Sequence, residues 1–314
     1  MNKKFEFPPE LDFIRAGRLS QKHSTTSMDG KICVITGTTS GVGYQAAIRL
    51  AKAGAKIVTI VRNKEKAEKL CTEIRSFSVS EPDYYVADFT NLADVRKATV
   101  AILANYPHID VLINNAGVHM TTRQLTVDVN ETVFAVNHLA SFLITSLLLK
   151  RMIESAPSRI IQVNSEGHRF NGLDINDLNW EKRNYGGYGG YGASKTAQLM
   201  TVWELNDLLA GKGVTINAMH PGAVKSNIGT NNGKLYNCFS KFLIQPTLKN
   251  PEISGEAIYY LASSPEMNGV SGRFYNLTNE EIPAPHAQNR ELGKKIFQRS
   301  KELVQLDKTD AYEV

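Results

Sequence analysis

Short apolar runs alternate with amphipathic stretches along most of this chain. Apolar runs of this length are typical of strands that are buried on both faces of a sheet. They predict strands at 31–36, 56–61, 84–87, 109–113, 159–163, 214–219 and 273–276. The stretches between them have helical periodicity or high charge. They predict helices at 44–53, 64–75, 92–104, 126–153, 191–210, 251–262 and 290–305.

This alternation indicates an α/β fold, in which a doubly wound parallel sheet of about seven strands is covered on both faces by helices. We expect one domain at 29–314, because α/β domains of this size commonly fold as a unit. Residues 1–28 contain Pro8, Pro9 and mixed charges, and we expect them to form a loosely attached extension. The loop-like stretch 227–250 is expected to form a lid over the substrate.

The first predicted strand runs into a glycine-rich turn that leads directly into a helix. Glycines allow the backbone to approach phosphate oxygens, and the free N–H groups at a helix N-terminus favour an anion. A tight turn without a ligand is the alternative, but the strand–turn–helix context favours cofactor binding. The candidate contacts are Gly37, Thr39, Ser40, Gly41, Val42 and Gly43.

Other strand ends carry further candidates for cofactor binding. Arg62 follows the second strand, where an acidic side chain would favour NAD and an arginine can hold a 2′-phosphate. NADP(H) is therefore favoured over NAD(H), although an arginine at a strand end can also be simply solvated. The remaining candidates are Asp88 and Phe89 beside the adenine, and Asn115, Ala116 and Gly117, where asparagine can join strand ends or contact a ribose.

Tyr191 and Lys195 are four residues apart on a predicted helix and so lie on one face. A nearby ammonium favours the phenolate and lowers the pKa of the tyrosine towards a useful range. Tyr185 and Tyr188 have glycine where this lysine would stand. Because glycines weaken a helix, we expect Tyr191 at or near the start of its helix, beside a mobile loop.

Two more polar residues belong with this pair. Ser165 follows the fifth strand, at the sheet edge where α/β folds bind ligands, although serine is also an ordinary turn residue. Asn137 lies in an apolar stretch and needs hydrogen-bond partners, which could be purely structural.

Composition excludes several other classes of function. The chain is 42% hydrophobic and 21% charged, and its net charge of +5 is spread along the sequence. Neither nucleic-acid binding nor a membrane surface is indicated. Three separated cysteines indicate neither disulfides nor a metal site. We expect no secretory signal, no apolar run long enough to span a bilayer, and a cytoplasmic location.

Between about 31 and 276, these motifs together resemble the short-chain dehydrogenase/reductase family, whose fold is of the Rossmann type. Thr36-Gly37-x-x-x-Gly41-x-Gly43 is similar to the cofactor loop of the family, and Asn114-Asn115-Ala116-Gly117 to its sheet-stabilising motif. The resemblance implies a catalytic tetrad of Asn137, Ser165, Tyr191 and Lys195. It also implies that Pro221, Gly222, Val224 and Ser226 orient the nicotinamide, with Ser226 standing where threonine is common.

The chain is more closely similar to the retinol dehydrogenase-like branch of that family. The residues that carry this resemblance are Arg62, Val136-Asn137-His138-Leu139, Ser165-Glu166-Gly167-His168-Arg169, His220-Pro221-Gly222 and Gly272-Arg273-Phe274-Tyr275. Several animal members of that branch have an N-terminal membrane anchor, and we expect none here.

The resemblance implies reversible hydride transfer between NADP(H) and a carbonyl or alcohol carbon. In that reaction Tyr191 would be the acid/base, Lys195 would lower its pKa and hold the nicotinamide ribose, Ser165 would bind the substrate oxygen, and Asn137 would steady a water in a proton relay. Three alternatives are a non-catalytic NADP sensor, a double-bond reductase on the same scaffold, and a sugar-nucleotide epimerase, although the loop spacing argues against the last.

The substrate and the oligomeric state are not identified by the sequence. Phe242, Leu243 and Ile244 in the predicted lid favour a hydrophobic aldehyde, ketone or alcohol, although they could simply pack the lid. Homodimers and homotetramers are common in the family, and either is compatible with this chain.

Overall fold

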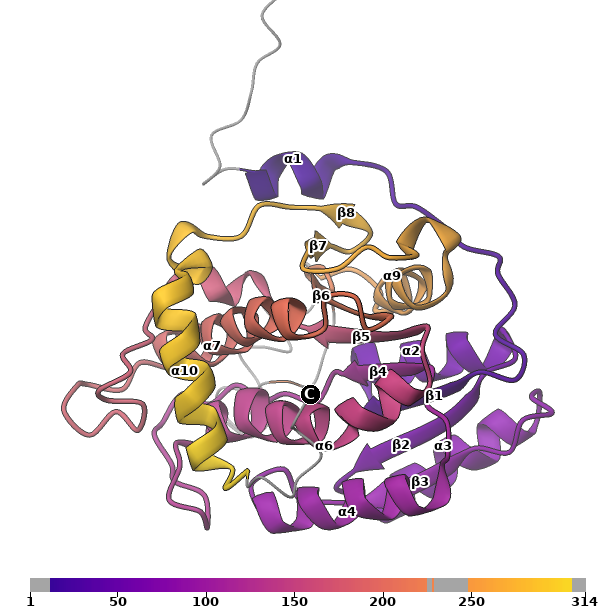
Figure 1. The fold of residues 1–314 in the computed structure, drawn as a ribbon, viewed down its shortest axis with the longest axis horizontal. Coiled ribbons are helices and arrows are strands. Elements are labelled where there is room, and N and C mark those ends of the chain that lie inside the picture. Colours follow the sequence, from indigo (N-terminus) through magenta and orange to yellow (C-terminus); the bar gives the residue numbers. More distant parts are fainter. Residues whose placement is uncertain (1–11, 225–227, 229–247, 307–314) are drawn as a thin grey trace, which may run out of the picture.

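The computed structural model describes residues 12–224, 228 and 248–306. Within them, eight strands form one sheet in the order β3-β2-β1-β4-β5-β6-β7-β8 (Figure 1). The strands are β1 (Ile32–Thr36), β2 (Lys56–Val61), β3 (Asp83–Val86), β4 (Val111–Asn114), β5 (Ser158–Val163), β6 (Val214–His220), β7 (Phe274–Asn276) and β8 (Asn279–Glu280).

The first seven strands are parallel, and β8 returns antiparallel to β7. This confirms the predicted doubly wound α/β class. The sequence pattern missed β8, because a two-residue strand has no measurable periodicity. The strand order reverses between β1 and β4, and a crevice at the carboxyl ends of the strands is expected at such a point.

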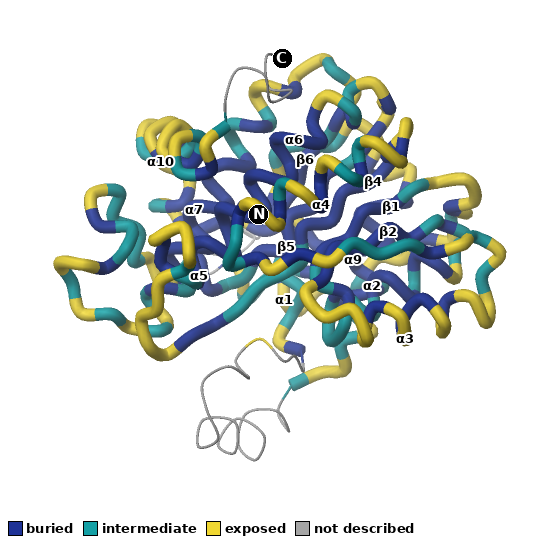
Figure 2. Tube along the Cα trace, turned by 90° about the horizontal axis from the view of Figure 1, so that it is seen from below, coloured by how far each residue is buried: buried dark blue, intermediate teal, exposed yellow. Residues whose placement is uncertain are grey.

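Helices cover both faces of the sheet. The longer ones are α2 (Gly41–Lys52), α3 (Lys64–Arg75), α4 (Leu92–Asn105), α6 (Ala140–Glu154), α7 (Gly187–Leu208), α9 (Glu252–Ser263) and α10 (Arg290–Leu303). Successive strand residues point to opposite faces, so Val34 packs in one core with α4, α6, α7 and α10. Ile35 packs in the other core with α2, α3 and α9. The central strands are accordingly buried in Figure 2, whereas the edge strand β3 is not, and exposed positions lie on the outer turns of helices and on loops.

The apolar stretch before and through α6 is the longest in the described residues. It consists of α5 (Thr132–Phe134), the π-helical turn η2 (Ala135–Leu139) and α6. Together, Thr132–Glu154 is long and apolar enough to cross a membrane by length and composition, but its most apolar part is completely buried in the protein. The expectation that no run reaches this length was therefore wrong. A helix that packs against neighbours on all sides is apolar all round.

Helix α7 begins at Gly187, four residues before the predicted start. A Cβ at Gly189 would lie 2.9 Å from the Trp180 ring, and one at Gly190 would lie 2.6 Å from the Tyr185 hydroxyl. The glycines are therefore compatible with helix here because they let the first turn of α7 pack closely against the preceding loop. That tertiary contact outweighs their low helix propensity.

The described part of the expected extension is not loosely attached. Helix α1 (Asp12–Arg18) buries Ala16 completely, and the Lys22 N–H donates to Thr278 Oγ1 at 2.8 Å. Further along, the Tyr259 hydroxyl donates to the carbonyl of Thr26 at 2.5 Å. The prediction failed because these partners lie far away in the sequence.

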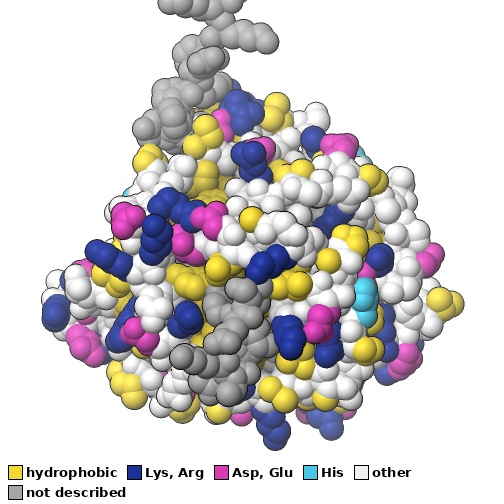
Figure 3. Space-filling model, in the orientation of Figure 1, with side chains coloured by type: hydrophobic (Ala, Val, Ile, Leu, Met, Phe, Trp, Pro, Cys, Tyr) yellow, Lys and Arg dark blue, Asp and Glu magenta, His cyan; other side chains and the backbone are white. Residues whose placement is uncertain are grey.

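The surface carries interspersed charges. On the face shown in Figure 3, basic and acidic side chains are scattered among uncharged ones. Cys33 and Cys71 are buried free thiols, and Cys238 lies outside the described residues.

Candidate active site

The glycine-rich turn joins β1 to α2 at the carboxyl edge of the sheet. Gly37 and Gly41 have φ angles of +71° and +59°, which favour glycine. A Cβ at Gly37 would lie 2.9 Å from Ala116 Cα, and one at Gly43 would lie 2.4 Å from the Gly37 carbonyl oxygen. Ser40, the N-cap of α2, makes no side-chain capping bond. The first N–H groups of α2 can therefore bind a phosphate.

The end of β4 supports this turn. The Asn115 Nδ2 donates to the carbonyls of Thr36 and Gly37, at 2.9 and 3.0 Å. The backbone N–H groups of Asn115 and Ala116 both donate to Thr36 Oγ1 at 2.9 Å. Of the two roles that the sequence allowed for Asn115, the structure therefore shows the joining of strand ends.

The turn opens into a cavity of about 670 Å³ that also contains Ser165, Tyr191 and Lys195. Nearly all predicted cofactor contacts line it, namely Gly37, Thr39, Ser40, Gly41, Val42, Gly43, Arg62, Asp88, Phe89, Asn115, Ala116, Gly117, Pro221, Gly222 and Val224. Ser226 and most of the predicted lid, including Phe242, Leu243 and Ile244, lie outside the described residues. The structure therefore brings the candidate cofactor and catalytic residues to one place.

Lys66 is a cavity-lining cation that the sequence reading overlooked. It belongs to α3, the helix predicted at 64–75. Asn63 caps this helix by accepting the Lys66 N–H at 2.8 Å, which places Lys66 in the first turn, close to Arg62. The sequence feature that could have identified Lys66 is its position in the first helical turn after Arg62.

Tyr191, Lys195 and Ser165 meet at the inner end of the cavity. The Ser165 side chain lies close enough to Tyr191 to lower its pKa, and Lys195 Nζ lies 5.9 Å from the centre of the Tyr191 ring. Lys195 is buried, and its Nζ donates to the Val163 carbonyl at 2.9 Å and to Gln198 Oε1 at 3.3 Å. The helical spacing thus gives the predicted proximity.

Burial controls the protonation of both groups. It raises the pKa of Tyr191, and the Ser165 side chain opposes that rise. It also lowers the pKa of Lys195 to about 7. The net direction for Tyr191 is opposite to the lowering expected from Lys195. The reason is that burial disfavours the charged form of both groups. It reduces the fraction of protonated lysine, and it makes the phenolate less stable than the phenol.

Asn137 lies behind the cavity and is fully buried in the π-helical turn η2. Its Oδ1 accepts the Val118 N–H at 2.7 Å, and its Nδ2 donates to the Val118 carbonyl and to Ser194 Oγ, both at 3.0 Å. Its own carbonyl accepts from Gln198 Nε2 at 3.1 Å. The side chain therefore fixes the strand-to-helix connection at Val118, and the backbone carbonyl is linked to Lys195 through Gln198.

Gln198 and Asn164 are buried polar residues that the sequence reading missed. Gln198 Oε1 accepts from Asn164 Nδ2 at 2.9 Å as well as from Lys195. Asn164 Oδ1 in turn accepts the Ser165 N–H at 2.8 Å. These two amides therefore connect the backbone of Ser165 with the ammonium of Lys195. The sequence feature that could have identified Gln198 is its position three residues after Lys195, on the same face of the helix.

An aromatic row extends from Tyr191 to the surface. The ring of His119 lies 5.7 Å from that of Tyr191 and 5.5 Å from that of Tyr188. Tyr188 lies 5.4 Å from Phe170. Tyr188 and Phe170 are 64% and 56% exposed, which is unusual for two adjacent aromatic rings.

Comparison with known proteins agrees with this geometry. Residues 31–236 match a family model described as short chain dehydrogenase. The chain is similar to human retinol dehydrogenase 13, with 34% identity over 94% of this chain and 90% of that protein. It is also similar to human retinol dehydrogenase 14, with 34% identity over 93% and 91%.

Solved structures show the same fold. An uncharacterized protein from Mycobacterium paratuberculosis has a TM-score of 0.70 and 26% identity, over 89% of this chain and 95% of that one. A short chain dehydrogenase from Shigella flexneri, complexed with NADP, has a TM-score of 0.64 and 21% identity, over 81% and 99%.

Proposed function

This chain belongs to the short-chain dehydrogenase family and is retinol dehydrogenase-like, and we propose that it transfers a hydride between NADP(H) and the carbonyl or alcohol carbon of a hydrophobic small molecule. Membership makes it an NAD(P)-dependent oxidoreductase acting on CH–OH groups. The proposal rests on one observation: Ser165, Tyr191 and Lys195 line the same cavity as the glycine-rich turn.

The residues that line the cavity fit a dinucleotide. The turn from Gly37 to Gly43 and the N-terminus of α2 would hold the pyrophosphate. The turn can keep this shape only with glycine at both positions, because a Cβ would collide with Ala116 or with the Gly37 carbonyl oxygen. Arg62 and Lys66 would hold a 2′-phosphate, and Asp88 would lie at the adenine end. The nicotinamide, when bound, supplies the hydride.

The protein supplies the proton and the binding of the substrate oxygen. In reduction, the Tyr191 hydroxyl donates its proton to that oxygen as negative charge develops there. Ser165 Oγ accepts the Gly167 N–H at 3.0 Å, which leaves its own hydrogen to donate to the same oxygen. Because burial raises the pKa of Tyr191, the phenol is protonated at neutral pH and ready for reduction. Protonated Lys195 stabilises the phenolate that remains.

The test is turnover by the purified protein on a panel of aldehydes, ketones and enones, with NADPH and NADH run in parallel. We expect alcohol products and a preference for NADPH. A saturated carbonyl product from the enones would instead support double-bond reduction. No turnover on any carbonyl, with NADPH bound, would overturn the proposal.

Arg62→Ala is expected to reduce kcat/KM for NADPH by about 10- to 100-fold and to leave that for NADH nearly unchanged. The reason is that a charge-assisted hydrogen bond to the 2′-phosphate contributes about 1.5–3 kcal/mol. Steady-state kinetics with both cofactors measure this. Lys66→Ala should have the same sign of effect, and Lys64→Ala is the control, because Lys64 is exposed and lies 3.8 Å from Glu68. Equal losses with NADH would contradict the assignment.

Tyr188→Ala is expected to raise KM about 5- to 30-fold for long apolar substrates, with little change in kcat. The reason is that burying an aromatic ring against an apolar substrate contributes about 1–2 kcal/mol beyond the reacting centre. A small aldehyde is the control substrate, since it would not reach the aromatic row. If KM rises equally for both, the row does not bind the apolar part of the substrate.

A further inference from the structure

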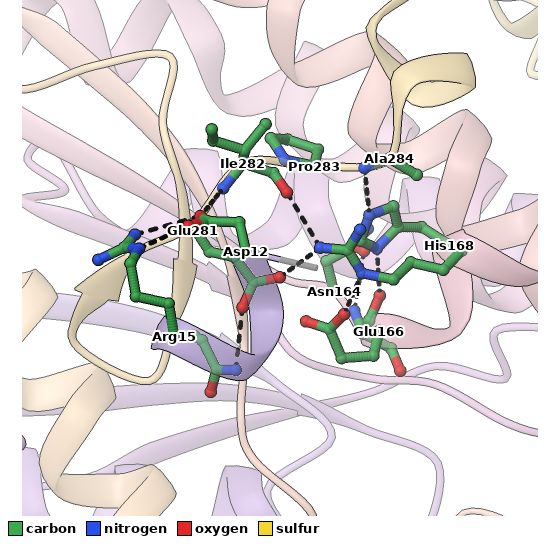
Figure 4. A network of polar contacts seen from close by, with 12 residues as sticks. Asp12, Arg15, Asn164, Glu166, His168, Glu281, Ile282, Pro283 and Ala284 are labelled. Carbon is green, nitrogen blue, oxygen red and sulfur yellow. Dashed lines mark hydrogen bonds and ion pairs between the residues drawn. The ribbon is translucent and has the colours of Figure 1, made fainter. Parts of the chain in front are cut away.

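The loop after β5, which begins at Ser165, contacts residues 281–284, a segment between β8 and α10 (Figure 4). His168 is the connection. Its ring Nδ1 lies 2.8 Å from the Ser165 carbonyl oxygen, and the Ala284 N–H donates to its Nε2 at 3.0 Å. The His168 N–H also donates to the Ser165 carbonyl, at 3.1 Å.

These partners determine the tautomer of His168. A carbonyl can only accept, and a backbone N–H can only donate. The ring must therefore carry its hydrogen on Nδ1 and leave Nε2 as an acceptor, which is the neutral form. Burial lowers the pKa of His168 to about 3, so this form persists across the physiological range. The ring is fully buried and packs edge-on against Phe274 at 5.0 Å.

Residues 281–284 are themselves fixed by ionic contacts. Arg169 pairs with Glu166 at 2.5 Å and with Glu281 at 2.6 Å, and it donates to the Ile282 carbonyl at 3.0 Å. On the other side, the carboxylate of Asp12 in α1 accepts the Ile282 N–H at 2.8 Å. Figure 4 shows these contacts converging on the segment from both sides. The Ala284 N–H is therefore a fixed point to which His168 can tie the catalytic loop.

We propose that His168 is a positioning residue for the reaction, because it ties the Ser165 carbonyl to the Ala284 N–H and thereby fixes the direction of the Ser165 hydroxyl. This inference rests on the proposed role of Ser165. The Ser165 Oγ must meet the Gly167 N–H, Tyr191 and the substrate oxygen together. A rotation of the Ser165 peptide would break that arrangement, and a displacement of about 1 Å can cost about 10²-fold in rate.

The test is a double-mutant cycle between His168 and Ser165. His168→Phe keeps a ring but loses both polar contacts, and we expect it to lower kcat by about 10- to 100-fold with the dissociation constant for NADPH unchanged. His168→Asn can place an amide donor near the position of Nδ1, so it should recover most of the rate. In a Ser165→Ala background, His168→Phe should cause little further loss, because its effect passes through the absent hydroxyl.

His138→Phe is the matched control, because His138 is also buried and neutral and its Nε2 contacts Ser300 Oγ at 2.7 Å. It should lower the melting temperature without coupling to Ser165→Ala. If His168→Phe does not fold, the cycle is run with His168→Leu, which is smaller and also lacks both polar contacts, and the same coupling is expected. Unchanged kcat, or equal losses with and without Ser165, would overturn the positioning role alone. Normal turnover by Ser165→Ala would overturn the role of Ser165 and this inference together.

Discussion

Replacing Tyr191 with phenylalanine is expected to lower kcat by about 10²- to 10⁴-fold, the usual contribution of a positioned acid/base group. The variant keeps the ring that packs beside Gly167 and His119 but has no proton to give to the substrate oxygen. The dissociation constant for NADPH should stay nearly the same, because the glycine-rich turn and Arg62 are unaltered. Single-turnover kinetics together with NADPH fluorescence titration measure the two effects separately.

Tyr188→Phe is the matched control for this prediction. Tyr188 lies three residues earlier in the same helix and is 64% exposed, and position 192, one turn further along, is glycine. It should therefore keep near-normal turnover of a small aldehyde. If Tyr191→Phe also turned that aldehyde over at the normal rate, the acid/base assignment would be wrong.

The sequence was most informative where local chemistry decides the structure. The helix at 64–75 has the predicted bounds, because Asn63 caps its start and charged residues keep one face in water. The glycine-rich turn was predictable because only glycine tolerates the backbone of Gly37 and the close approach of Ala116. The spacing of Tyr191 and Lys195 likewise gave their proximity, since it depends only on helix geometry.

The sequence was least informative where a partner lies far along the chain. The early start of α7 depends on Trp180 and Tyr185, and the attachment of α1 depends on Ile282. The upward shift of the Tyr191 pKa depends on burial, which helical spacing does not report. His168 showed no signal of its role, because Ala284, which donates to its Nε2, lies 116 residues away in the sequence. The role of such a residue becomes visible only in the folded structure, where each buried donor and acceptor can be matched with its partner.

Arg169→Met is expected to destabilise the protein by about 3–5 kcal/mol at pH 8, because it leaves buried carboxylates without their cation. The Glu281 side chain is fully buried, and both it and Glu166 bond to Arg169. Burial and the neighbouring Glu281 already raise the pKa of Glu166 above its ordinary value of 4.5, and loss of Arg169 would raise it further. Urea unfolding at pH 5 and pH 8 measures the effect.

The sign of the pH dependence follows from linkage. A carboxyl whose pKa is raised on folding binds its proton more tightly in the folded state, so its contribution to stability is lost as the pH rises above 4.5. The variant should therefore be closer to the unmodified protein at pH 5 than at pH 8. Arg273→Met is the control, since the side chains of Arg273 and Glu280 are both 56% exposed and such a pair contributes about 0–1 kcal/mol. A loss for Arg169→Met no larger than the control, or one that grows as the pH falls, would show that the arginine does not neutralise these buried acids.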